Sequence, residues 1–106
     1  MDNEVIIKIG DIEYHFKLKS QKIVGLEKEF GKNIFEIVQD LSFETITAFM
    51  GASLISPNIN KFDLMDDLLS VYSLQEIAEK IMIEIAIKSG LIKKADLDNV
   101  EIEQKN

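Results

Sequence analysis

Apolar and polar residues alternate near the start of the chain. From Ile12 to Leu18 every second residue is apolar, the period of a β-strand with one buried face. Val5 to Ile9 forms another apolar run, and only Gly10 and Asp11 separate the two runs. Glycine at the first position of a two-residue turn favours the type II′ turn of a tight hairpin. The pattern predicts an N-terminal β-hairpin whose apolar face packs on other elements, because a lone hairpin is marginally stable in water.

The period becomes helical after this hairpin, and residues with capping chemistry precede each helical run: Ser20, Asn33, Ser42, Asn60 and Ser73. Gly31 lies where a left-handed C-terminal cap is expected, and Pro57 marks the clearest break. The expected fold class is therefore α+β, with an N-terminal β-hairpin packed against a bundle of about five mostly short α-helices. We expect a single α+β domain over residues 1–90 and a flexible C-terminal tail over residues 91–106.

The hydrophobic pattern also predicts which side chains are buried. Ile12 should lie on the inner face of the hairpin with Tyr14 and Phe16. Leu41 and Phe43 should belong to the buried stripes of the second and third helices.

A run of isoleucines from Ile81 to Ile87 does not fit a single buried stripe. Ile83 and Ile87 project roughly opposite to Ile81 and Ile85 on a helix, because two residues span about 200°. Such a segment is a central helix, a surface for self-association or partner association, or, since it alternates and is rich in isoleucine, a strand. The residues expected to form an association surface are Ile83, Ile87, Leu91 and Ile92.

The charge is distributed unevenly. The formal net charge is −7, and residues 36–79 hold eight acidic residues against one base, Lys61. This acidic stretch either keeps the protein soluble or forms a docking face for a basic partner. The chain has no arginine and the wrong overall sign for a nucleic-acid groove, so we expect no nucleic-acid partner.

Cysteine is absent, which removes disulfide scaffolds, thiolate zinc sites and cysteine nucleophiles together and fits a cytoplasmic protein. No apolar run approaches the roughly 20 residues that a membrane-spanning helix needs, and the N-terminus lacks the basic start of a signal peptide. We therefore expect no membrane association.

Candidates for catalysis or metal binding are few. His15, the single histidine, falls on the polar side of the second strand, so we expect it to be exposed and not catalytic. Asp63, Asp66 and Asp67 lie on one helix and form either a solvated face or a metal site, which would need more converging oxygens. The segment Asp96–Glu101 resembles the start of a calcium loop but lacks its central glycine. We expect no enzyme activity, no cofactor and no metal.

Several short segments follow one another along the chain, and the order in which they occur is its most specific feature. They are the Gly10-Asp11 turn, the aromatic strand with Tyr14 and Phe16, Leu26-Glu27 followed by Gly31-Lys32, Ile34-Phe35-Glu36, Leu41-Ser42, Gly51-Ala52-Ser53-Leu54, Asn60-Lys61-Phe62-Asp63 and Leu68-Leu69. This order, over roughly residues 5–90, resembles the tail assembly chaperones of long-tailed phages and prophages of Gram-positive bacteria.

The resemblance implies a non-enzymatic protein that acts in the cytoplasm of the host bacterium. It would bind the tape measure protein, keep it soluble, help recruit tail tube subunits, and be absent from the mature virion. The alternatives are a small phage structural adaptor of the head–tail connector type, another acidic protein–protein interaction module, an enzyme or metal protein, and an acidic DNA mimic. Formation of a homo-oligomer is left open.

Overall fold

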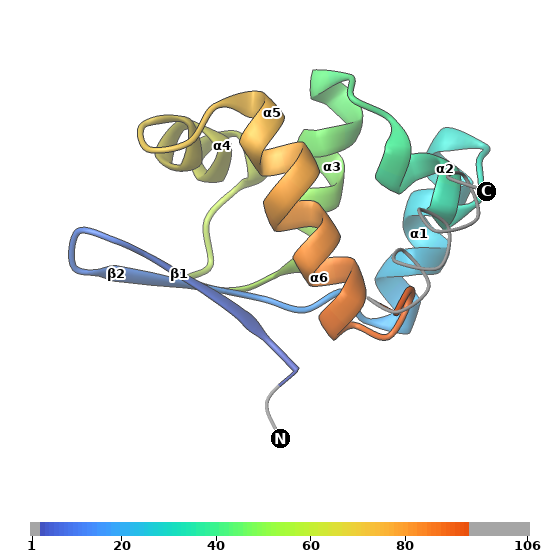
Figure 1. Cartoon of the computed structure of the whole chain (residues 1–106), viewed down its shortest axis with the longest axis horizontal. Coiled ribbons are helices and arrows are strands. Elements are labelled where there is room, and N and C mark those ends of the chain that lie inside the picture. The colour runs from blue at the N-terminus through green and yellow to red at the C-terminus, as the bar shows by residue number, and fades with distance from the viewer. Residues whose placement is uncertain (1–2, 94–106) are drawn as a thin grey trace, which may run out of the picture.

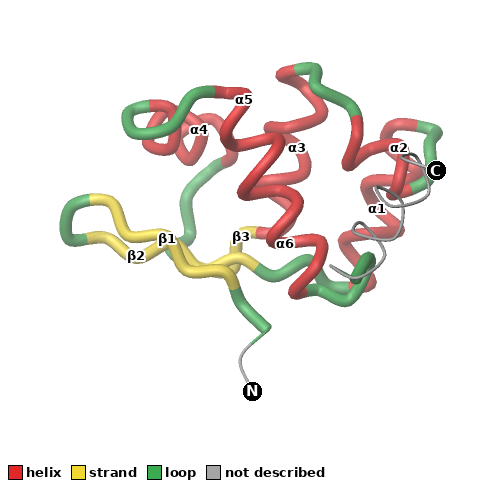
Figure 2. Tube along the Cα trace, in the orientation of Figure 1, coloured by secondary structure: helices red, strands yellow, loops and turns green. Residues whose placement is uncertain are grey.

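The computed structural model describes residues 3–93 and contains a small antiparallel sheet with helices packed over one of its faces (Figure 1 and Figure 2). Strands β1 (Val5–Ile9) and β2 (Ile12–Phe16) form the predicted hairpin, in which Ile9 lies opposite Ile12. Gly10 has a φ of 62°, and no residue other than glycine has a positive φ in the described part of the chain. This combination matches the signs of φ in a type II′ turn.

A third strand, β3 (Leu54–Ser56), pairs antiparallel with β2 and completes the sheet in the order β1-β2-β3. The sequence did not predict β3, because Leu54 continues the apolar stripe of the preceding helix. Strand β2 ends earlier than predicted, at Phe16, and the Lys17 N–H donates to the Ser53 carbonyl oxygen at 2.8 Å. Strand β3 directly follows the helix that ends at Ser53, so this edge of the sheet is attached to that helix.

Within residues 3–93, five helical runs follow the hairpin: α1 (Ser20–Phe30), α2 (Ile34–Gln39), α3 (Phe43–Ser53), α4 (Lys61–Leu69), and a continuous run made of α5 (Leu74–Glu76), the π-helical turn η1 (Ile77–Ile81) and α6 (Met82–Lys88). The predicted α+β class, with an N-terminal hairpin and about five mostly short helices, is confirmed.

The predicted caps are confirmed for four of these runs, whose capping side chains accept a backbone N–H bond: Asn33, Ser42, Asn60 and Ser73. The prediction for α1 is wrong, because Ser20 is already helical and Lys19 occupies the cap. A lysine side chain has no acceptor, so this helix start lacks a side-chain cap. Gly31 ends α1 as predicted, with φ 63° and its N–H bonded to the Glu27 carbonyl.

Helix α3 is the most enclosed element, since it contacts α1, α2, α4 and α6. Its buried side chains are Thr45, Ile46, Thr47, Ala48, Phe49, Met50 and Ser53. The crossing with α4 is close: a Cβ atom added at Gly51 would lie 2.6 Å from the Lys61 Cβ. Thr47 is buried, and its hydroxyl has no hydrogen-bond partner within residues 3–93. Close packing around α3 therefore positions the surrounding helices.

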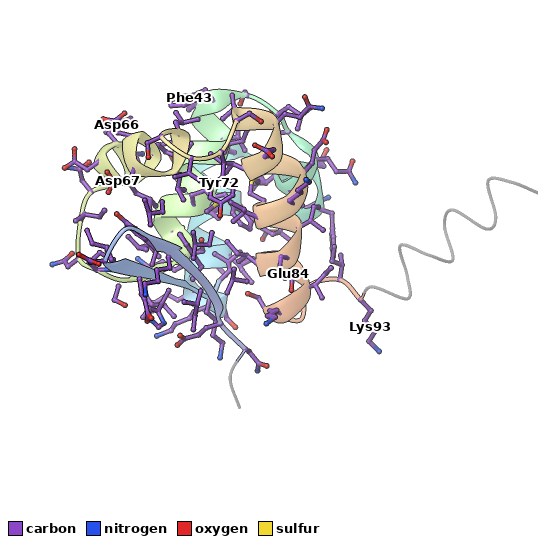
Figure 3. The ribbon with its side chains drawn as sticks, turned by 60° about the vertical axis from the view of Figure 1, so that its left-hand side comes forward. Phe43, Asp66, Asp67, Tyr72, Glu84 and Lys93 are labelled. Carbon is purple, nitrogen blue, oxygen red and sulfur yellow. The ribbon has the colours of Figure 1, made fainter. Side chains whose placement is uncertain are left out.

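The hairpin is attached to α4 through a buried tyrosine. Tyr14 is only 1% exposed, and its hydroxyl donates to Asp67 Oδ2 at 2.5 Å. This bond to a carboxylate, followed by burial, raises the pKa of Tyr14, because both favour the neutral phenol. The same bond explains why Asp67 is half-buried, whereas Asp66 is exposed on the outer side of α4 (Figure 3).

Three predicted core positions are wrong: Ile12, Leu41 and Phe43 are 49%, 58% and 46% exposed. Ile12 lies beside the turn, at the end of the hairpin that extends past the helices (Figure 1). Leu41 and Phe43 flank the cap Ser42, where the chain turns between α2 and α3. Ile12 and Phe43 are thus the first residues of their elements and Leu41 lies between two helices, where the periodic pattern no longer determines burial.

The isoleucine-rich segment is helical, so the strand interpretation is wrong. Ile77, Met82 and Ile85 are fully buried, and α6 contacts α3, α2 and β1, as expected for an internal helix. The Met82 N–H donates to the carbonyl of Ile77, five residues earlier, which defines the π turn. A π turn contains one residue more than an α turn, yet Ile81 and Ile85, which were predicted to share one face, are both buried.

Candidate partner-binding groove

An apolar groove lies between α2 and the end of α6, with a volume of about 180 Å³. Seven of its eight lining residues are apolar, and the eighth is Gln39: Ile34, Phe35, Val38, Gln39, Ile83, Ala86, Leu91 and Ile92. We call this feature the α2/α6 groove. It contains three of the four residues that the sequence nominated for association.

Local hydrogen bonds hold the α2 side of the groove in place. Asn33 and Glu36 form a reciprocal capping box, with bonds of 2.9 and 3.0 Å. The Ile34 N–H donates to the Glu27 carboxylate on α1 at 2.8 Å. A helix of only six residues is unstable on its own, so these bonds and the burial of Ile34 and Val38 determine where it lies.

The other side of the groove depends on how α6 ends. Gly90 adopts φ 86°, the Gly90 N–H donates to the Ile87 carbonyl at 3.0 Å, and the Leu91 N–H donates to the Ala86 carbonyl at 2.9 Å. These two bonds define a Schellman motif, which commonly brings the residue after the glycine back against the helix. Leu91 and Ile92 accordingly pack against the core.

Leu91 and Ile92 fall within the predicted flexible tail, yet both side chains pack against the core of the domain that was predicted for residues 1–90. Residues 94–106, the remainder of the predicted tail, lie outside the described part of the chain.

The four nominated residues are all partly exposed rather than fully buried or fully exposed. Ile83, Leu91 and Ile92 line the groove, whereas Ile87 does not. The α2 side was missed, and its most accessible apolar member is Phe35, which is 51% exposed. One signal was present in the sequence: adjacent residues such as Ile34 and Phe35 lie about 100° apart on a helix and cannot occupy the same narrow stripe.

His15 is less exposed than predicted. Its side chain is 27% exposed and lies between two carboxylates, with Nδ1 2.9 Å from Glu4 Oε1 and Nε2 3.2 Å from Glu13 Oε1. The hydrogen bond to Glu4 is the main cause of the raised pKa of His15, because it favours the protonated imidazolium. The arrangement connects the residue before β1 to β2.

The aspartates of α4 have separate structural roles. The Asp63 N–H donates to Asn60 at the start of the helix, and Asp67 accepts the Tyr14 hydroxyl. Within residues 3–93, no three histidine, cysteine, aspartate or glutamate side chains are grouped so that they could hold a metal ion. The calcium-loop-like segment Asp96–Glu101 lies outside the described residues.

The helices of residues 3–93 include none that is both long and apolar enough to cross a bilayer. In comparisons with known proteins, the chain matches no protein-family model, no curated protein and no solved structure. The α2/α6 groove is therefore assessed from its own geometry: it offers apolar side chains on two helices and a shape suited to an apolar side chain of another protein.

Proposed function

We propose that this protein is a non-enzymatic tail assembly chaperone of a phage or prophage. In this role it binds the tape measure protein through the α2/α6 groove and helps recruit tail tube subunits. It acts in the cytoplasm of the host bacterium and leaves before the virion matures. The proposal combines the resemblance in the order of sequence segments with one structural observation, the convergence of Ile83, Leu91 and Ile92 with α2 in an apolar groove.

The groove suits a partner that exposes apolar side chains on a helix. Helix-in-groove recognition inserts one or two apolar side chains of an amphipathic helix between two packed helices. Phe35 forms an accessible part of the lining, and Ile34 and Val38 lie deeper. The chain's net charge of −7 keeps a complex with a long apolar helical protein soluble through mutual repulsion between complexes.

The test is co-expression with the tape measure protein of the same phage or prophage, which is expected to be a long, largely helical protein. The soluble fraction of the long protein should rise when the wild-type chain is present. Phe35→Asp should abolish this gain. Complete burial of a phenylalanine is worth about 1.5–3 kcal/mol, and Phe35 has half of its surface left to bury, so its contribution is about 1 kcal/mol before the cost of a buried aspartate.

Phe62→Asp provides the matched control, because Phe62 is 60% exposed on α4, outside the groove lining. Circular dichroism should show both variants folded. If the wild-type chain leaves the long protein equally insoluble, the chaperone proposal is wrong. If Phe35→Asp and Phe62→Asp act alike, the groove is not the docking surface.

A second measurement separates a chaperone from a structural adaptor. Mass spectrometry of purified virions should detect the tube and tape measure proteins but not this chain. Stoichiometric amounts of the chain in virions would favour the adaptor.

A further inference from the structure

A second groove, between α1 and α3, has a different chemical character. Its volume is about 450 Å³, and its lining comprises Gln21, Lys22, Gly25, Leu26, Glu29, Ala48, Ala52 and Lys61. A hollow of about 190 Å³ also borders Lys22 and Ala52, and its lining includes Lys17 and Lys19. We call the two together the lysine groove. It shares no residue with the α2/α6 groove.

The lysine groove is a concentration of positive charge on an acidic protein. Among residues 3–93 the ion pairs are those of His15 with Glu4 and Glu13 and of Lys32 with Asp40, so the four groove lysines form none. Glu29 is the single carboxylate in the lining. Lys61 Nζ lies over the Phe62 ring, 5.4 Å from its centroid, and this contact leaves its positive charge unneutralised. The groove therefore offers a net positive charge to a partner, although the whole chain carries a net charge of −7.

The floor of this groove includes a glycine that the fold itself does not need. Gly25 lies in the middle of α1 without a positive φ, and a Cβ added there would meet no atom within 4 Å. Alanine would stabilise the helix relative to glycine at such a position. Glycine in a helix is favourable where another backbone comes close. Across the groove, Ala48 and Ala52 also have small side chains, which leave room for such a backbone.

We propose that the lysine groove binds an acidic helical segment of a partner protein. Carboxylates spaced one turn apart on that segment face Lys22 and Lys61, while its backbone passes over Gly25. At about 0.1 M salt the Debye length is roughly 10 Å, so charges in the groove lining act on a docked segment more strongly than charges that lie farther than this from it. With the α2/α6 groove, the chain then has two separate docking surfaces, and this inference does not depend on the proposed function.

The experiment uses a fluorescent alanine-based peptide of roughly 20 residues, long enough to be helical, with glutamates along one face. Fluorescence anisotropy with the full chain should show binding that weakens as salt is raised. A peptide with glutamine in place of each glutamate should not bind. Lys22→Glu combined with Lys61→Glu should weaken binding by about tenfold or more, because charge reversal replaces attraction with repulsion.

Two further variants distinguish a docked segment from a general charge effect. Lys80→Glu with Lys88→Glu changes the net charge equally at two exposed positions outside the groove and should leave binding unchanged. Gly25→Leu keeps every charge but fills the floor, and should abolish binding without unfolding the protein, since the space around it is empty.

The proposal is overturned if the control pair weakens binding as much as the groove pair, if Gly25→Leu binds normally, or if the glutamine peptide binds as well. Equal affinity for a single-stranded oligonucleotide would indicate a site for polyanions in general and would also overturn it. If light scattering shows a wild-type dimer that the peptide dissociates, the occupant is a second copy of the chain instead.

Discussion

Two glycines on helices of equal length offer a direct test of the packing between α3 and α4. Gly51 lies where α3 crosses α4, and its added Cβ would be 2.6 Å from the Lys61 Cβ. Carbon atoms normally pack at about 3.5–4.0 Å, so the alanine variant would be too close by roughly 1 Å. Because Lys61 Cβ is attached directly to the backbone, rotating the lysine side chain cannot relieve the contact. The helices must separate instead.

The free energy of unfolding should therefore fall in Gly51→Ala and rise in Gly25→Ala. Overpacking typically costs about 1–3 kcal/mol, and replacing a helical glycine with alanine returns at most about 1 kcal/mol. At Gly25 only the gain applies, because nothing lies within 4 Å of the new methyl group. The difference between the two variants isolates the cost of the close contact and should be about 1–3 kcal/mol.

Urea denaturation followed by far-ultraviolet circular dichroism measures both variants against wild type. In thermal unfolding, each kcal/mol should shift the Tm by roughly 4–8 °C in a domain of this size. Equal stability of Gly51→Ala and Gly25→Ala would refute the reasoning, because it would mean that α3 and α4 do not approach each other at Gly51.

Three further predictions concern polar groups. Thr47→Val removes a buried hydroxyl that has no hydrogen-bond partner in the described chain, and should raise the unfolding free energy by about 1 kcal/mol in urea titrations; a loss would indicate a partner for the hydroxyl. Tyr14→Phe deletes the bond to Asp67 and should lower stability by roughly 1–2 kcal/mol at pH 7, whereas unchanged unfolding would show that the bond is not stabilising. The pKa of His15 is raised, so protonation stabilises the fold at pH below about 6.5, and this stabilisation is lost as the pH rises through the folded-state pKa. In Glu4→Gln, the pKa measured by NMR of the imidazole should fall, and an unchanged value would exclude Glu4 as the main cause.

The sequence predicted most of the fold because its signals are local. The hairpin follows from alternation around Gly10, and the start of α4 follows from Asn60, whose side chain accepts the Asp63 N–H. Strand β3 could not be predicted, because three residues carry little periodicity and Leu54 also fits the helix before it. Its pairing with β2 is a tertiary contact that no local pattern encodes.

The candidate site was predicted on one side only. Ile83, Leu91 and Ile92 were identified because apolar residues on two faces of a helix imply two contacts. Phe35 was not identified, because the fold brings α2 and α6 together across more than forty residues of intervening chain. The lysine groove was also missed, since Lys22 and Lys61 belong to helices separated by the whole of α2 and α3.

The π turn at Ile77–Ile81 changes how the helix that forms one wall of the groove responds to the loss of a residue. Each residue of a regular α-helix advances the chain by 1.5 Å and about 100°, so a deletion from a regular helix rotates everything after it by that angle. The π turn already contains one residue more than an α turn. Deleting one residue from this turn would restore a regular helix and leave Ile83 and Ala86 close to their present places against α2. During evolution, a single-codon deletion at this turn can therefore be tolerated, whereas the same deletion in α3 would turn the residues after it away from their neighbours.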